Sequence, residues 1–192
     1  NAAMHTPIQH WPISDKFVSM RIRELILETA DLAGLRTFYG ETLGLPVEGN
    51  AERIVITIGA SQLVFNTTRQ GQPFYHFAFT IPANSIESAK EWLERKVSLV
   101  WIKDYNSEIA DFVNWHAKSV YFFDTAGNIV ELIARFDLDN ATDEPFSPAQ
   151  MLSISEVGVV FGENELETRT KEILQQYQLS YFDKQTPLPH FK

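Results

Sequence analysis

Apolar and polar residues recur along the chain in one repeated order. Three stretches each begin with a short apolar run, pass through a polar break, continue as an amphipathic segment and return to apolar residues. They start at Ile22, Phe74 and Ile154. Apolar residues spaced three or four apart predict a helix, whereas short alternating or continuous apolar runs predict a strand. Recurrence of the same order indicates a repeated structural module.

The helical part of each stretch follows a polar residue suited to begin a helix. Short polar side chains at such positions accept hydrogen bonds from the first backbone N–H groups of a helix. The candidate capping residues are Asp31 in the first stretch, Asn84 or Ser85 in the second, and Asn164 in the third. We therefore predict helices over 31–43 and 85–95, and a third helix after Asn164.

Two short strand-like runs follow each of the first two helices. They cover 54–58 and 62–66 in the first stretch, and 119–123 and 129–134 in the second. Each pair is separated by a glycine-containing turn, which predicts a β-hairpin. With Val47 and Val100 marking the middle strands, both stretches are predicted to fold as β-α-β-β-β.

Helices with one apolar side next to antiparallel hairpins predict an α+β fold. We expect two βαβββ modules that form a curved mixed sheet with the helices on its outer face, plus a partial third module. The predicted divisions are an N-terminal extension over 1–19, module one over 20–70, module two over 74–136, and a partial third βα module over 150–192.

The third stretch lacks a closing hairpin, and two prolines near the end of the sequence disfavour a strand ladder. A half-module leaves an unpaired strand edge and an uncovered apolar face. Either the natural chain continues beyond Lys192 and completes the pairing, or the half-module docks on another chain. We expect this segment to associate with a second copy of the chain in a two-fold homodimer.

Strand alternation places one unusual residue on a defined face. His76 interrupts the apolar run FYHFAFTIP and shares a face with Ala78 and Thr80, opposite Phe77 and Phe79. A buried imidazole is costly unless it has a partner. His76 is thus either a hydrogen-bonded structural residue or part of a site.

Two glutamates occupy comparable positions. Glu24 lies in the first opening strand and Glu131 in the last strand of module two, each among apolar neighbours, and Glu156 aligns with Glu24 and His76 in the repeat. Solvated or salt-bridged carboxylates are the alternative interpretation. If the modules lie side by side, Glu24, His76 and Glu131 converge, and a divalent metal is the simplest common partner.

Composition excludes several classes of partner. The formal net charge is −9, which disfavours nucleic acid and anionic membrane surfaces. No apolar run reaches the roughly 18 residues that a membrane-spanning helix requires. The sequence has no cysteine, so it forms neither disulfides nor thiolate metal sites. A small molecule is the expected partner, and the cytoplasm is the expected location.

Two segments resemble the vicinal oxygen chelate superfamily, which includes glyoxalase I, extradiol dioxygenases, and bleomycin and fosfomycin resistance proteins. LETADLAGLRTFYGETLGLPV is similar to the first-helix pattern of that family, and VYFFDTAGNIVELIAR looks like its closing hairpin. The resemblance implies the paired-module fold. It places the metal-ligand positions at Glu24, Phe65, His76 and Glu131. Glutamate stands where the family usually has His or Gln, and Phe65 cannot ligate a metal.

The resemblance implies two alternative functions. The first is an enzyme of lyase, isomerase or dioxygenase type that acts on a small oxygenated substrate through a divalent metal (Zn, Fe, Mn or Ni), with no organic cofactor. The second is a metal-free protein that sequesters a ligand, like the bleomycin-resistance proteins. The candidate residues are Glu24, His76 and Glu131 for the metal, His116 and Glu131 for catalysis, and Phe65, Trp115 and Tyr121 for substrate binding. His116 is chosen because an unperturbed imidazole titrates near neutral pH, although a histidine in a loop can also be merely exposed.

Overall fold

The computed structural model describes residues 21–162, 164–179 and 181. The extension predicted over 1–19 and the last part of the predicted third module, from 182 onward, lie outside these residues. None of the helices in the described ranges is long and apolar enough to cross a membrane.

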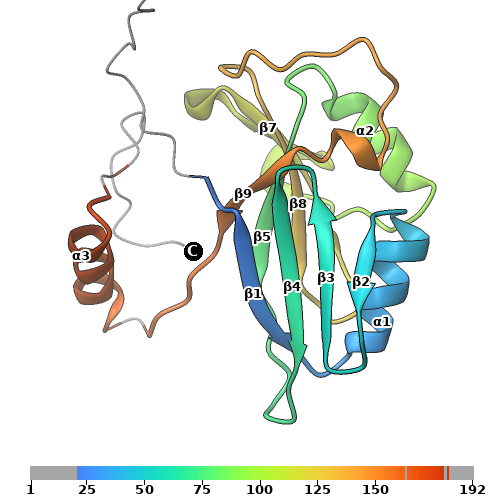
Figure 1. Ribbon diagram of the computed structural model, residues 1–192. Coiled ribbons are helices and arrows are strands. Elements are labelled where there is room, and N and C mark those ends of the chain that lie inside the picture. Colours follow the sequence, from blue (N-terminus) through green and yellow to red (C-terminus); the bar gives the residue numbers. More distant parts are fainter. Residues whose placement is uncertain (1–20, 163, 180, 182–192) are drawn as a thin grey trace, which may run out of the picture.

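The first module forms a four-stranded sheet with a helix packed on one side (Figure 1). Its elements are β1 (Glu24–Thr29), α1 (Leu32–Thr37), the π-helical turn η1 (Phe38–Thr42), β2 (Val47–Gly49), β3 (Arg53–Ile58) and β4 (Ser61–Thr67). The strand order is β1-β4-β3-β2, with β1 parallel to β4 and the other pairs antiparallel. Asp31 accepts a hydrogen bond from the Gly34 backbone N at 2.9 Å, which confirms the predicted start of the helix.

The second module repeats this topology. Its elements are β5 (His76–Ile81), α2 (Ile86–Glu94), the 3₁₀ turn η2 (Lys103–Tyr105), β6 (Ile109–Phe112), the 3₁₀ turn η3 (Val113–Trp115), β7 (Ala117–Phe123) and β8 (Ile129–Arg135). The order β6-β7-β8-β5 again has a parallel pair, β5 with β8, beside antiparallel neighbours. The α+β fold of two βαβββ modules is therefore as predicted.

The middle strand of module two is not where the sequence predicts it. Residues around Val100 make two isolated bridges, between Leu99 and Phe122 and between Ile102 and Ser107, and the Val100 backbone N donates to the Tyr121 carbonyl at 2.8 Å. The chain then reverses at Asn106, in the left-handed conformation that Asn tolerates, and β6 takes the edge of the sheet beside β7.

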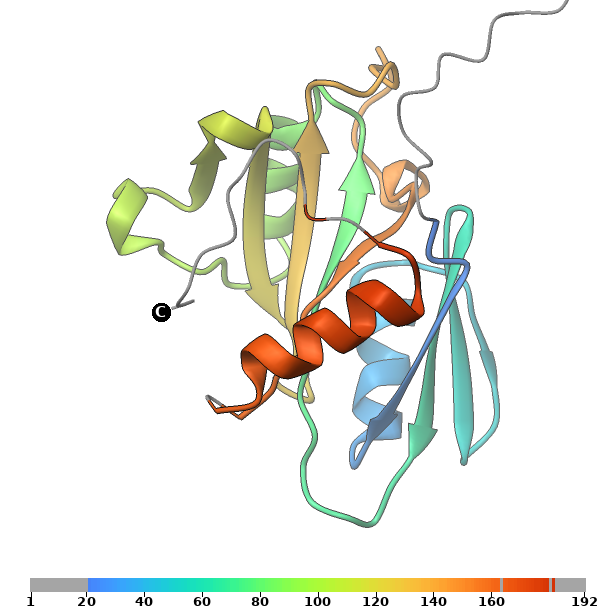
Figure 2. The ribbon, with the colours of Figure 1, turned by 90° about the vertical axis from the view of Figure 1, so that its left-hand side faces the viewer.

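Both helices cover the same side of the two sheets, and one apolar core lies between helices and strands. Figure 2, turned by 90° from Figure 1, shows both sheets in front of α1 and α2. The largest fully buried side chains are Tyr39, Phe65, Phe77, Phe79, Phe122, Leu35, Leu43, Ile54, Ile56, Ile58, Leu63 and Ile81.

The two family-like segments meet inside this core. Tyr39, in the first segment, donates a hydrogen bond to Asp124 of the second at 2.9 Å. Asp124 also accepts from the Ala126 and Asn128 backbone N atoms, both at 3.0 Å, and from Asn128 Nδ2 at 2.7 Å. Burial raises the pKa of the Asp124 carboxyl despite these four donors. The Tyr39–Asp124 contact thus joins the two modules.

A ninth strand lies between the modules. The short turn η4 (Pro148–Gln150) leads into β9 (Ser153–Val157), which pairs antiparallel with β5. The Ile154 side chain is buried, and its backbone N donates to Ser61 Oγ at 3.0 Å in the first module. The strand predicted to open the third repeat therefore extends the second sheet.

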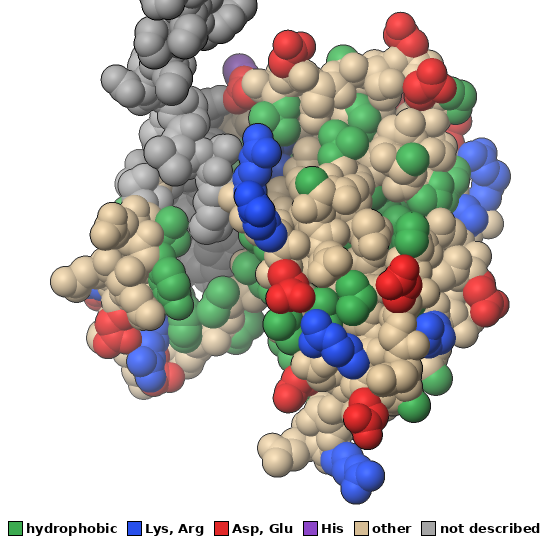
Figure 3. All heavy atoms as spheres, in the orientation of Figure 1, with side chains coloured by type: hydrophobic (Ala, Val, Ile, Leu, Met, Phe, Trp, Pro, Cys, Tyr) green, Lys and Arg blue, Asp and Glu red, His purple; other side chains and the backbone are tan. Residues whose placement is uncertain are grey.

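The last described helix, α3 (Leu166–Gln176), stands apart from the body, on the side away from α1 and α2 (Figures 1 and 2). None of its described residues is buried. Apolar side chains lie along the side of this segment that faces the body, and charged side chains gather at its lower end in Figure 3.

Candidate acid–base site

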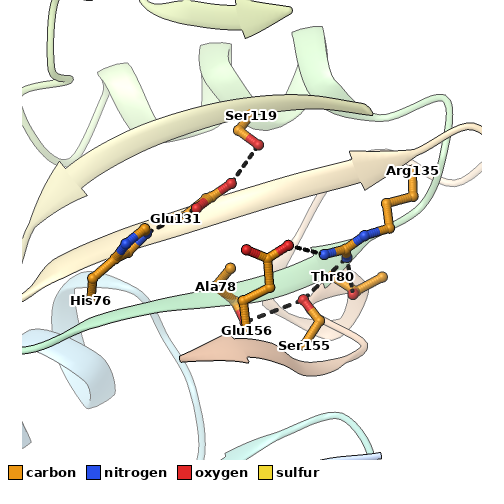
Figure 4. Close-up of polar contacts among 8 residues, drawn as sticks. All are labelled: His76, Ala78, Thr80, Ser119, Glu131, Arg135, Ser155 and Glu156. Carbon is orange, nitrogen blue, oxygen red and sulfur yellow. Dashed lines mark hydrogen bonds and ion pairs between the residues drawn. The ribbon is translucent and has the colours of Figure 1, made fainter. Parts of the chain in front are cut away.

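A chain of three hydrogen-bonded side chains crosses the second sheet (Figure 4). His76 Nε2 lies 2.9 Å from Glu131 Oε2, and Ser119 Oγ donates to Glu131 Oε1 at 2.6 Å. They come from β5, β8 and β7. They lie on the side of the second sheet that points away from α1 and α2, which we call the site face.

Strand register explains this convergence. Ala78 pairs with Glu131, and Glu131 pairs with Tyr121. Alternation then places His76, two residues before Ala78, and Ser119, two residues before Tyr121, on the same face. Phe77 and Val130 point the other way and are buried in the common core.

The environment gives the His76 ring a defined orientation. The Glu131 side chain is only 3% exposed, and both of its oxygens accept hydrogen bonds, as a carboxylate requires when it is removed from water. An ionised Glu131 can only accept, and opposite such a carboxylate His76 Nε2 is the donor and Nδ1 is left as the acceptor. The His76 side chain is 39% exposed, so this acceptor belongs to a ring that solvent and ligands can reach.

Tyr121 adds a hydroxyl beside this pair. Its ring centroid lies 6.0 Å from that of His76. Burial raises the pKa of the Tyr121 phenol well above its ordinary value, and the negative charge of Glu131 raises it further. Tyr121 is therefore a neutral hydrogen-bond donor throughout the physiological pH range.

A second polar group occupies the other end of the same face. Arg135 Nη1 donates to Thr80 Oγ1 and to Ser155 Oγ, each at 3.2 Å, and Arg135 Nη2 donates to Glu156. Burial raises the pKa of Glu156, and the nearby Glu131 charge adds to this shift, while Arg135 opposes it.

The predicted metal ligands do not all converge. Glu24 lies on β1 in the first sheet, where its carboxylate is 3.5 Å from Arg53 Nη2. In the part of the chain that the structure describes, no three His, Asp or Glu side chains are close enough to hold a metal ion. The physical reason is β9, which pairs with β5 on the side facing module one and brings Glu156, not Glu24, toward His76 and Glu131. These residues do not fit the metal centre that the resemblance implies.

Phe65 lies on the opposite side of its sheet from the predicted position. It is fully buried in the core, with its ring 6.2 Å from that of Tyr39 and 6.5 Å from that of Phe77. The parallel register pairs Ile26 with Val64 as it pairs Ala78 with Glu131. The module-one counterpart of Glu131 is therefore Val64, because a shift of one residue reverses the face of a strand.

The two remaining candidates flank the site face. The Trp115 ring stacks on Phe112 at 5.4 Å, and both pack against Ala78, Ala117 and Ile133. His116 has a left-handed backbone conformation and a 63% exposed side chain, whose Nδ1 is 3.0 Å from Asp137. It has no hydrogen bond to Glu131, so the structure does not join it to the three-residue chain.

Sequence reasoning missed Ser119 and Arg135, and it noted Glu156 without assigning it to a site. Ser119 and Arg135 share the alternation of Tyr121 and Glu131. That signal becomes usable only once the β7–β8 register is known. Assigning Glu156 to the site would have required knowing which strand β9 pairs with.

Comparisons with known proteins give similarity in fold at low sequence identity. No protein-family model matches the sequence, and none of the curated proteins matches it. A lactoylglutathione lyase from Agrobacterium tumefaciens is 21% identical over 58% of this chain and 90% of that chain, with a TM-score of 0.47. A glyoxalase/bleomycin resistance protein/dioxygenase from Nocardioides is 18% identical over 65% of this chain and 89% of that chain, with a TM-score of 0.49. A protein of the same description from Alicyclobacillus acidocaldarius is 17% identical over 60% of this chain and 92% of that chain, with a TM-score of 0.47.

Proposed function

We propose that this chain, which has the paired-module fold of the vicinal oxygen chelate superfamily, moves a proton on a small oxygenated substrate. His76 is the acid–base group, and Glu131 and Ser119 are positioning residues. One observation carries the proposal: a solvent-accessible imidazole lies 2.9 Å from a carboxylate that is only 3% exposed.

The pairing suits a histidine that alternates between two protonation states. When Nδ1 takes up a proton, the resulting imidazolium lies next to the Glu131 carboxylate, which stabilises the positive charge. Ser119 occupies the second Glu131 oxygen and so limits rotation of the carboxylate. A positioned general acid–base group of this kind contributes about 10²–10⁴ to a reaction rate.

The reaction class follows from the neighbouring donor. His76 Nδ1 removes a proton from a carbon next to a carbonyl group, and the C–H electron pair moves to the carbonyl oxygen. The Tyr121 hydroxyl donates a hydrogen bond to the resulting enolate oxygen, as preorganised donors do in oxyanion sites. Reprotonation of the same carbon by His76 re-forms the carbonyl group and completes the exchange.

A divalent metal is not part of this proposal. A bound Zn²⁺, Fe²⁺, Mn²⁺ or Ni²⁺ would supply Lewis-acid stabilisation of the same enolate oxygen. The described residues do not provide the ligand set, because Glu24 is paired with Arg53 on the other sheet. We assign the stabilising contact to Tyr121.

Solvent deuterium exchange tests the proposal directly. The protein is incubated in D₂O with hydroxyacetone, pyruvate or 2-butanone, and loss of the carbon-bound proton signal is followed by ¹H NMR. We expect exchange above the buffer rate, and a loss of about 100-fold in His76→Gln and in Glu131→Gln. His116→Gln is the matched control, since His116 lies outside the hydrogen-bonded group. Wild-type exchange equal to buffer, or equal rates in His76→Gln and wild type, would refute the proposal.

Ligand sequestration without chemistry is the second candidate. The stacked Phe112 and Trp115 rings, 28° apart in plane, lie against the apolar part of the site face and suit a planar ligand group. This function predicts quenching of Trp115 fluorescence by an aromatic ketone such as acetophenone, absent in Trp115→Phe, with no deuterium exchange in any of the three carbonyl probes.

A further inference from the structure

We propose that Arg135 anchors the carboxylate of an anionic substrate, and that Glu156 occupies this anchoring position in the structure. The inference rests on the proposed function, because it names the substrate class of the same site. The substrate would be a small oxo acid whose carboxylate binds Arg135 and whose carbonyl end reaches His76.

The Arg135 guanidinium is already oriented for such a ligand. Two neutral hydroxyls, from Thr80 and Ser155, accept hydrogen bonds from Nη1 at 3.2 Å each. They orient the guanidinium without neutralising its positive charge. Its other end, Nη2, carries the single carboxylate contact, to Glu156. The side chain is 25% exposed. The planar arginine fork is the protein group best matched to a carboxylate.

Arg135 also reaches the correct part of the sheet. Ala78 is the register partner of Glu131 on one side and of Glu156 on the other. Neighbouring strands are about 4.8 Å apart, so the backbones of these two glutamates are separated by about 10 Å across Ala78. Arg135 contacts Thr80 and Glu156, so its guanidinium lies on the far side of Glu156 from the His76–Glu131 pair, as Figure 4 shows. The proposed substrate would span this interval in place of the Glu156 side chain.

A bulge in β9 produces the contact with Glu156. The register with β5 shifts between Ala78 and Phe79, so Ser155 is inserted and Ser155 and Glu156 both meet Arg135. Bulges of this kind re-aim side chains and occur often beside active sites. A regular ladder would have placed Ser155, not Glu156, opposite Ala78.

Glu156 is a replaceable partner. Its side chain is 34% exposed and belongs to an edge strand, so it can rotate away without moving the buried Ile154 that anchors β9. Burial and the neighbouring Glu131 charge disfavour its ionised form and raise its pKa. Replacing the Glu156 carboxylate on Arg135 by a ligand carboxylate therefore costs less free energy than breaking an ion pair and leaving Arg135 without an anionic partner.

The alternative role for this ion pair is structural, as a link between β8 and β9. The two roles predict opposite effects of Glu156→Gln on ligand binding. As a structural link, the substitution loosens β9 and leaves the affinity for carboxylates unchanged or weaker. As an internal occupant, Glu156 competes with the ligand, and its neutralisation strengthens carboxylate binding.

Calorimetric titration with matched acids and esters decides between them. The probes are acetate, pyruvate and benzoate, each compared with its methyl ester. We expect at least one acid to bind wild type about tenfold more tightly than its ester, the lower range for a charge-assisted pair. Glu156→Gln should tighten that acid severalfold and leave the ester unchanged, and Arg135→Gln should abolish the preference. Glu24→Gln and Arg53→Gln are matched controls, because they alter an Arg–Glu pair on the other sheet.

The absence of any acid–ester preference across the series would overturn the proposal, as would a Glu156→Gln variant that binds the acid no better than wild type. Circular dichroism checks folding of Arg135→Gln; if that variant unfolds, the ester comparison and Glu156→Gln still decide. The preference is independent of proton exchange. A clear preference without exchange refutes the proposed function alone, and exchange without the preference refutes the anchoring role alone.

Discussion

Replacement of Tyr39 by Phe tests whether the buried hydrogen bond between the two family-like segments holds the modules together. The change removes one hydroxyl from a fully buried ring and leaves the ring packing with Phe38 and Phe65 in place. Asp124 keeps three of its four donors, but its Oδ2 loses the 2.9 Å contact with Tyr39.

The expected cost follows from the charge of the acceptor. Hydrogen bonds to charged groups contribute about 1.5–3 kcal/mol, so we expect a loss of about 2 kcal/mol in the free energy of unfolding at neutral pH. For a chain of this size, that loss lowers the melting temperature by about 4–8 °C.

The cost should also depend on pH. Burial raises the pKa of folded Asp124 above its unfolded value, so its contribution to stability is fully present below the unfolded pKa and is lost as pH rises through the folded pKa. The Tyr39 hydroxyl favours the ionised form, and its removal raises the folded pKa further. The difference between Tyr39→Phe and wild type therefore grows as pH rises through this range.

Urea unfolding monitored by circular dichroism, at several pH values from acid to neutral, measures both effects. Tyr75→Phe is the matched control, because its hydroxyl only accepts a 3.3 Å bond from the exposed Glu28 backbone N. We expect the control to cost less than about 0.5 kcal/mol. A Tyr39→Phe cost no larger than that of Tyr75→Phe, or one that does not increase with pH, would show that the Tyr39–Asp124 bond does not join the modules energetically.

Two further outcomes are expected. Gly59→Ala should cost more than about 2 kcal/mol in urea unfolding, since φ is +51° and a Cβ there would lie 2.1 Å from the Leu152 carbonyl oxygen. Gly71→Ala, with φ +69° and no atom within 4 Å, should cost about 1 kcal/mol. Equal costs would contradict the contact between module one and Leu152, the residue before β9. As the sequence predicts, we propose a homodimer formed through the C-terminal segment, so light scattering should give twice 21.9 kDa for the wild type. The double substitution Leu166→Glu, Tyr177→Glu changes two exposed side chains of that segment and should give a monomer. A monomeric wild type would refute this association.

The fold was predictable because its signals are local. Asp31 begins a helix through a hydrogen bond to a residue three positions later, and the hairpins depend on neighbouring runs and their turns. The strand near Val100 was predicted only in part: Leu99 and Val100 contact β7, but the regular strand that pairs with β7 is β6, and that choice is a long-range decision. The position of β6 depends on the reversal at Asn106, which sequence alternation does not reveal.

The site was predictable only in part, for the same physical reason. His76 and Glu131 could be placed on one face by alternation, and the structure brings them together. Phe65 was assigned to the wrong face because its register with β1 was unknown, and one residue decides between core and surface. Arg135 and Ser119 became visible only when the pairing of β7 with β8 was fixed.

The three opening strands show why the repeat does not repeat its chemistry. Each carries an ionisable residue at the aligned position, and each residue finds a different partner: Glu24 pairs with Arg53, His76 with Glu131, and Glu156 with Arg135. Glu24 and Glu156 meet a permanent cation, so both become parts of ion pairs. His76 meets a carboxylate, the partner that orients an imidazole while leaving its second nitrogen available. The same position thus gives an ion pair in two strands and an acid–base group in the third, and the difference comes from the partner residue that another strand of the same sheet supplies: Arg53 on β3, Glu131 and Arg135 on β8.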